Sequence, residues 1–64
     1  MRFIITPTPS NFAEDMREHV SEIQRIAEIE HVHEYRLEVI VTNKDQHFDL
    51  TEYCDKNELN MIDK

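Results

Sequence analysis

The chain has 64 residues, with 14 Asp and Glu against 7 Lys and Arg, so its formal net charge is -7. Proteins that bind nucleic acid or anionic membranes collect Lys and Arg to contact phosphates, and this balance therefore disfavours direct binding to either. The chain also contains no glycine. That absence excludes the common glycine-rich phosphate-binding loops and the usual nucleophile elbow of hydrolases.

The length predicts one small domain, residues 1–64, with a modest core, and association with a second copy is a common source of extra stability at this size. The single cysteine, Cys54, cannot form a disulfide within the chain, and one free thiol favours a reducing compartment. The apolar run at residues 3–5 is shorter than the roughly 7–15 residues of a signal peptide or the about 20 of a membrane span. We therefore expect a cytoplasmic protein.

The first elements along the chain are a strand and a helix. Residues 3–6 are β-branched or aromatic and predict a strand, which Pro7 ends before a stiff loop. Asn11, or Ser10 as an alternative, can cap a following helix, with Glu14 as its partner in a capping box. Apolar residues then recur at helical spacing and predict one buried face that runs to about residue 28 or 29. This stripe comprises Phe12, Met16, Val20, Ile23, Ile26 and Ala27.

The middle of the chain predicts a β-hairpin. Alternating apolar residues over 34–42 indicate a strand with one buried face, and residues 43–46 have the composition of a turn. If residues 47–51 form the second strand, Val41 faces Phe48 and Val39 faces Leu50, so both buried pairs are apolar. The alternative is that Asp49 caps a helix, with Glu52 as its partner, which would turn this strand into helix.

The last segment predicts a short helix over 51–57, capped by Thr51. Residues 58–64 then form either an extra turn or an edge strand. The expected fold is a small α+β domain of the order β-α-β-β-α, with a three-stranded sheet, a hairpin of the second and third strands, and one main helix packed on one face. Ile4 and Ile40 are expected on the outer face of that sheet.

Residues that could carry catalysis or hold a metal are sparse. His31 and His33 would point to one face of an extended strand, but zinc requires four ligands, or three and a water. Cys54 has no C-x-x-C partner, and the neighbouring Glu52 and Asp55 disfavour a reactive thiolate. We therefore predict no catalytic residues, no metal and no cofactor.

The acidic residues supply the candidate contact surface. Asp15, Glu18 and Glu22 fall on one flank of the predicted first helix, and the helix dipole favours acids only in the first turn. A solvated face is the ordinary alternative. A second acidic area is expected on the outer face of the strand over 34–42. The predicted protein-binding residues are Glu14, Asp15, Glu18, Glu22, Glu34 and Glu38.

These observations predict a non-enzymatic acidic protein that inhibits or modulates another protein by binding to a basic surface on it. That surface could be a nucleic-acid-binding site, because carboxylates can replace phosphates opposite Arg clusters. Small accessory proteins of viruses and mobile elements fit this size and charge. One alternative is a homo-oligomeric structural or assembly subunit, with Ile4 and Ile40 buried between copies. Another is a small enzyme whose site lies at a subunit interface.

Overall fold

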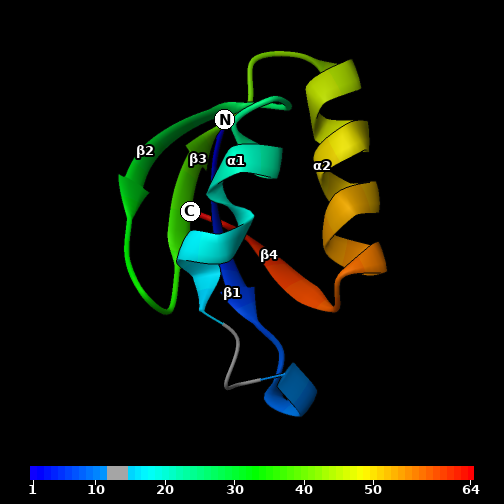
Figure 1. The fold of residues 1–64 in the computed structure, drawn as a ribbon. Helices are drawn as coiled ribbons and strands as arrows, with labels where there is room; N and C mark the ends of the chain where they lie inside the picture. Colours follow the sequence, from blue (N-terminus) through cyan, green and yellow to red (C-terminus); the bar gives the residue numbers. More distant parts are fainter. Residues whose placement is uncertain (12–14) are drawn as a thin grey trace.

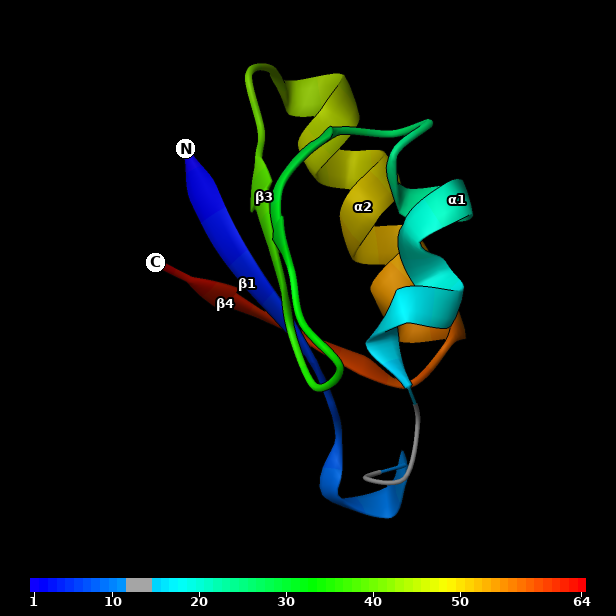
Figure 2. The same cartoon turned by 60° about the vertical axis from the view of Figure 1, so that its left-hand side comes forward.

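A four-stranded antiparallel sheet forms one layer of the molecule, and both helices lie on the same side of it (Figures 1 and 2). The structure is a computed structural model that describes residues 1–11 and 15–64. The structure has short 3-10 turns before and after residues 12–14, at Pro9–Asn11 and at Met16–His19. The helices and strands are β1 (Arg2–Pro7), α1 (Val20–Ile23), β2 (Glu28–Val32), β3 (Leu37–Ile40), α2 (Lys44–Lys56) and β4 (Leu59–Asp63).

The strands lie in the order β2-β3-β1-β4, so β3 and β1 are central and β2 and β4 are the edges. All three neighbouring pairs are antiparallel. With its two helices, the chain follows the order β-α-β-β-α-β, which is the split β-α-β topology also called ferredoxin-like. The α+β class is therefore confirmed, whereas the predicted sheet of three strands under one main helix is corrected to four strands and two helices.

The core lies between the sheet and the helices. Alternate residues of the central strands face it, and the register pairs Phe3 with Val39 and Ile5 with Leu37. Hydrophobic side chains from the Met16–His19 turn, from α1 and α2 and from β4 complete the core. The buried hydrophobic residues are Phe3, Ile5, Met16, Ile23, Ala27, Leu37, Val39, Val41, Leu50, Cys54 and Leu59.

The opposite face of the sheet is covered by neither α1 nor α2 (Figure 2). The same alternation that buries Phe3 and Val39 directs Ile4 and Ile40 to this outer face, as the sequence predicts. Both are partly buried by their neighbours within the sheet. Ile62 of β4 pairs with Ile4 on the same face and is 48% exposed.

The predicted hairpin at residues 43–46 is wrong, because these residues begin α2. Asn43 caps the helix, and its side-chain oxygen accepts a hydrogen bond from the Gln46 N–H at 2.8 Å. The Gln46 side chain reaches back and accepts from the Thr42 N–H at 2.9 Å. This arrangement is a variant of the capping box, in which the Gln46 side chain accepts from the residue before the cap and not from the cap itself.

The alternative helix interpretation has the correct element type, although the cap is Asn43 rather than Asp49. The predicted strand over 47–51 and the predicted helix capped by Thr51 form a single helix of 13 residues. Thr51 lies inside it and donates its hydroxyl to the His47 carbonyl. Phe48 does not pair with Val41 and is 66% exposed.

The first predicted helix is also too long. Helical structure spans Met16–His19 and α1, and residues 28–32, where the prediction ends the helix, form β2. The apolar stripe is nevertheless correct at Met16, Ile23 and Ala27, which are buried. Phe12 and Glu14 lie outside the described residues.

The true hairpin connects β2 to β3, and its turn is closed by the His33 N–H donating to the Arg36 carbonyl at 2.9 Å. The predicted strand over 34–42 is therefore shortened to Leu37–Ile40, and Tyr35 lies in the turn, 62% exposed.

Of the two options for residues 58–64, the edge strand is the correct one, because Leu59–Asp63 pairs with β1. The link from α2 to β4 turns sharply at Glu58, whose φ of 56° lies in the left-handed region. Neither helix in the described part of the chain has the length and apolar content needed to cross a membrane.

Candidate protein-binding surface

The carboxylate of Asp15 is occupied within the molecule. It caps the Met16–His19 turn by accepting a hydrogen bond from the Arg17 N–H at 3.0 Å. It also binds the Arg17 guanidinium, with 2.6 Å between Nη2 and Oδ2. The side-chain hydrogen bond from Arg17 lowers the pKa of Asp15 to about 2. A partner would have to displace Arg17 before it could use this charge.

The other predicted residues of the first flank are more open. Glu18 and Glu22 are exposed, and Glu22 lies 3.9 Å from Arg25, measured between Oε1 and Nη1. Pairs of this kind on an exposed surface are weak and leave the carboxylate accessible. Glu14 lies outside the described residues.

The second predicted area divides into two different environments. Glu34 is exposed in the β2–β3 turn, and its backbone carbonyl accepts from the Met16 N–H at 2.8 Å, which brings it to the Asp15–Arg17 pair. Glu38 lies on the uncovered sheet face and is only 7% exposed. The Lys64 ammonium donates to it and holds the pKa of Glu38 below its usual value. Glu38 is thus committed to an internal ion pair.

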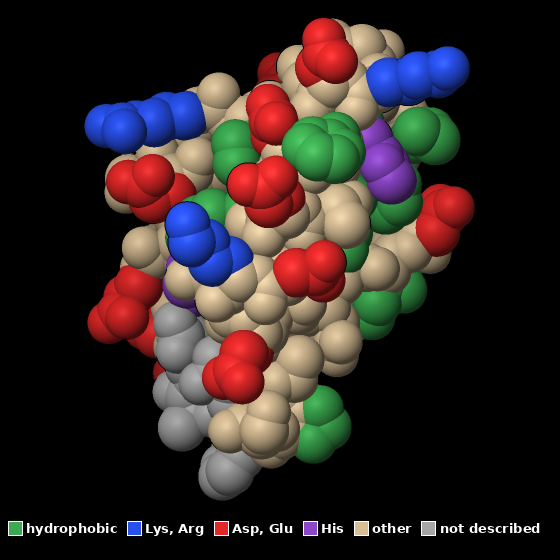
Figure 3. Space-filling model, turned by 90° about the vertical axis from the view of Figure 1, so that its right-hand side faces the viewer, with side chains coloured by type: hydrophobic (Ala, Val, Ile, Leu, Met, Phe, Trp, Pro, Cys, Tyr) green, Lys and Arg blue, Asp and Glu red, His purple; other side chains and the backbone are tan. Residues whose placement is uncertain are grey.

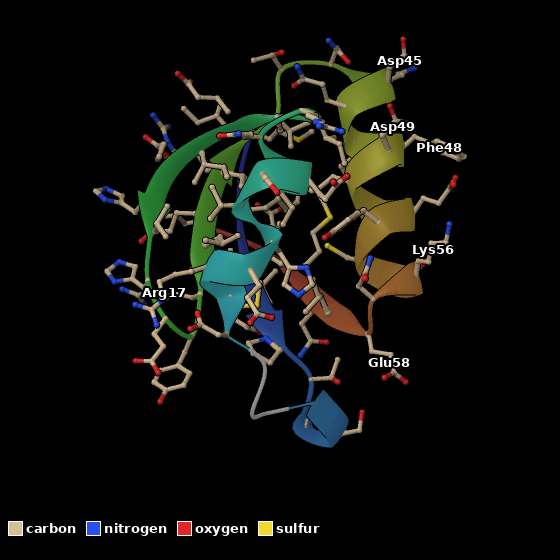
Figure 4. All side chains as sticks on the ribbon, viewed as in Figure 1. Arg17, Asp45, Phe48, Asp49, Lys56 and Glu58 are labelled. Carbon is tan, nitrogen blue, oxygen red and sulfur yellow. The ribbon has the colours of Figure 1, made fainter. Side chains whose placement is uncertain are left out.

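A different acidic surface lies on α2. Asp45, Asp49, Glu52 and Asp55 are all exposed there, and Phe48 is exposed among them. Spacings of three, four and seven residues place these side chains on one side of a helix. We call these five residues the α2 face. Figure 4 shows Asp45, Phe48 and Asp49 pointing away from the sheet, and Figure 3 shows acidic side chains spread over this side of the molecule.

The carboxylates of the α2 face lie beside Lys56, which follows Glu52 by four residues on the same side of the helix but makes no ion pair with them in the described part of the chain. Among the described residues, no Lys or Arg lies within 4.0 Å of Asp45, Asp49, Glu52 or Asp55 in an ion pair. Asp45 and Asp49 are like charges at i and i+4, which slightly destabilises an isolated helix. The surface therefore offers several carboxylates that a cationic partner can reach without displacing an existing partner.

A hollow of about 290 Å³ adjoins the α2 face, and it is lined by Ile26, Asp49, Glu52, Tyr53 and Lys56. Two carboxylates beside an aromatic and an aliphatic wall suit an arginine side chain, whose planar guanidinium binds carboxylates and stacks on aromatic rings. Lys56 also lines the hollow, so an arginine would enter beside an existing positive charge. Lysine, as a compact point charge, gains less from such walls.

One wall of this hollow, the ring of Tyr53, is held in place by a contact between α2 and the Met16–His19 turn. Tyr53 Oη lies 2.7 Å from Nδ1 of the buried His19, and the two rings meet edge to face with centroids 5.8 Å apart. The contact connects the Met16–His19 turn to α2 and fixes the ring of Tyr53.

The chemistry of the remaining candidates is limited. Within the described part of the chain, no group of three or more His, Cys, Asp or Glu is arranged to hold a metal. Cys54 is 2% exposed, and burial raises the pKa of its thiol to about 11, with a smaller contribution from Asp55. The thiol is therefore protonated at neutral pH, whereas a nucleophilic cysteine reacts as the thiolate.

Sequence reasoning missed the α2 face because the hairpin interpretation placed Phe48 in the core and Asp49 on a strand. The signal that could have found it is the Asn43-x-x-Gln46 pattern, a variant of the capping box, followed by apolar Leu50 and Cys54 at i and i+4. A helix that starts at residue 44 brings the four carboxylates to one side at once.

Comparison with protein-family models, with curated proteins and with solved structures finds no match for this chain. The split β-α-β topology occurs in proteins of many unrelated functions, so it carries no functional argument by itself. The functional argument therefore depends on the side chains of the α2 face and on their surroundings.

Proposed function

We propose that the protein is a non-enzymatic interaction protein whose α2 face binds a basic surface of another protein. The observation that carries this proposal is the exposed ring of Phe48 among carboxylates that have no basic partner in the described residues. Exposed acids alone would serve solubility, but a large exposed aromatic works against it.

An aromatic residue surrounded by charges has the layout of a binding hot spot. Aromatic anchors contribute most of the affinity at the centre of an interface, and the surrounding polar rim provides selectivity. Removing a Phe side chain from water is worth roughly 1.5–3 kcal/mol. The expected partner therefore has an apolar recess for Phe48 with Arg or Lys around it, and one arginine enters the hollow beside Asp49 and Glu52.

Such a basic surface is typical of sites that bind nucleic acid. The carboxylates of the α2 face would take the places of phosphates, and the protein would act as an inhibitor or modulator of that site. Direct contact with nucleic acid or with an anionic membrane is not expected from a chain with a net charge of -7. We place this activity in the cytoplasm.

The test is affinity capture from native lysate with identification of the captured protein, followed by binding of that purified protein to variants. The double variant Asp49→Lys, Glu52→Lys reverses two charges of the α2 face. Its matched control, Glu18→Lys, Glu22→Lys, makes the same change in net charge at exposed positions of the Met16–His19 turn and of α1. Phe48→Ala tests the aromatic anchor.

We expect the captured protein to bind wild type and the Glu18, Glu22 control, to lose the Asp49, Glu52 variant, and to dissociate as salt is raised. Removal of Phe48 should weaken binding by about tenfold or more. The proposal fails if the Asp49, Glu52 variant binds as well as wild type, or if only the Glu18, Glu22 change abolishes binding.

A further inference from the structure

We propose that the uncovered face of the sheet is the interface of a symmetric homodimer. This open sheet face has Ile4 near its centre, with Ile62 of β4 opposite it on one side and Glu38 of β3 opposite it on the other. Ile40 of β3 lies on the same face, opposite Arg2 of β1. Three isoleucines thus share a face that neither helix covers (Figure 2). Burying such a patch is favourable in proportion to the apolar area removed from water.

The charges on this face indicate a second copy as the occupant rather than a basic partner. The Arg2 guanidinium binds Glu30, with 2.9 Å between Nε and Oε1. On the same face, Glu38 receives the Lys64 ammonium and lies 3.9 Å from Arg36. Glu30 and Glu38 therefore have basic partners within the chain, whereas Glu28, opposite Ile40 on the same face, makes no ion pair among the described residues.

Charge balance matters because every copy has a formal net charge of -7. Two copies that met through their α2 faces would place unpaired carboxylates together, and like charges brought together across an interface cost several kcal/mol. Two copies that meet through their open sheet faces place balanced ion pairs and apolar side chains together. Of the two surfaces, only the open sheet face is suited to a partner identical to itself.

A two-fold arrangement fits this surface. In an isologous dimer the same patch is used twice, so Ile4, Ile40 and Ile62 of one protomer would interdigitate with the same residues of its partner. Stacked sheets lie about 10 Å apart with strands nearly aligned, and the isoleucines would fill part of that layer beside the Glu38–Lys64 ion pair. The face measures roughly 17 Å by 19 Å from standard strand geometry, which is below the size of a standard specific interface and predicts weak, reversible association.

This dimer would leave both α2 faces exposed on its two outer sides, because the helices lie on the other side of each sheet. The inference does not depend on the proposed function, since it uses neither the α2 face nor any other protein. Salt provides a further distinction. Binding to a basic partner should weaken as salt is raised, whereas self-association through an apolar face should persist or strengthen, because salt screens the repulsion between two copies of net charge -7.

The first test is sedimentation of the purified full chain from low micromolar to millimolar concentration. The double variant Ile4→Thr, Ile40→Thr keeps β-branched residues that suit a strand but removes apolar surface from the face. The control, Phe48→Ala, removes an exposed apolar group from α2 instead. We expect a monomer–dimer equilibrium that the double variant weakens about tenfold or more and the control leaves unchanged.

The second test keeps the inference falsifiable if the double variant does not fold, which circular dichroism would reveal. A wild-type sample that mixes isotope-labelled and unlabelled chains should show intermolecular nuclear Overhauser effects at the methyl groups of Ile4, Ile40 and Ile62. The inference is overturned if wild type stays monomeric at millimolar concentration. It is equally overturned if a dimer forms whose intermolecular contacts are absent from these methyl groups, or if Phe48→Ala abolishes association.

Discussion

At the scale of single residues, burial determines the protonation of the only cysteine. Cys54 lies on the side of α2 that faces the core, and burial raises the pKa of its thiol to about 11 from 9.0. In the unfolded chain the thiol ionises near its ordinary value. Between these two pKa values the unfolded state releases a proton that the folded state retains, so rising pH favours unfolding.

We therefore predict that the contribution of the neutral thiol to stability is fully present below about pH 9 and is lost as pH rises toward about 11. A shift of this size corresponds to roughly 2–3 kcal/mol in the free energy of unfolding. Urea unfolding of wild type and Cys54→Ala across this range isolates the effect, because the other groups titrate in both proteins. Parallel stability profiles for the two proteins would contradict the prediction.

At the scale of elements, the chain reverses direction between α2 and β4 at an unusual residue. Glu58 has a φ of 56°, and left-handed backbone is costly for residues with a Cβ, whereas glycine adopts it readily. The turn is nevertheless formed, with the Glu58 N–H donating to the Asp55 carbonyl at 3.4 Å. Helices commonly end with a left-handed residue at this position, and most of them use glycine.

Glu58→Gly should therefore raise the free energy of unfolding by about 0.5–1 kcal/mol, measured by urea denaturation. Asn60→Gly is the matched control, because Asn60 is an exposed residue of the extended strand β4. There the added backbone freedom should lower stability by a similar amount. Equal destabilisation by both glycines would show that Glu58 is not under strain.

The same elements show how far the sequence predicts the fold. The strand over residues 3–6 and the inward positions of Leu37, Val39 and Val41 follow from residue type and alternation, and the structure confirms them. The conversion of residues 28–32 to β2 does not follow, because the helical pattern extends to about residue 28 or 29 and Ile29 becomes a strand residue only by pairing with Val39. Local periodicity does not contain that long-range pairing.

The segment over residues 43–51 was ambiguous for another reason. Its alternation suits a hairpin, and the deciding information lies in the Asn43 and Gln46 side chains, which cap α2. The α2 face exists only if these residues form a helix and not a hairpin. The acidity follows from composition, and a basic partner stays a prediction, but the grouping of Asp49 and Glu52 beside Phe48 requires the helix.

At the scale of the whole molecule, charge is distributed unevenly between the two sides. The helical side presents the carboxylates of the α2 face without ion pairs among the described residues, and the open sheet side pairs Glu30 with Arg2 and Glu38 with Arg36 and Lys64. One side therefore suits a cationic partner and the other a second copy. Both associations can exist together, since the two surfaces lie on opposite sides of the sheet.

The most direct measurement of the central claim is a titration of the isotope-labelled protein with an arginine-rich peptide, followed by nuclear magnetic resonance. Every exposed carboxylate can compete for this probe, so the map of chemical-shift changes reports which surface binds it best. We predict the largest changes at Phe48, Asp49, Glu52 and Tyr53, and their decline as salt is raised. Largest changes at Glu18 and Glu22, or changes spread evenly over the acidic residues, would contradict the account.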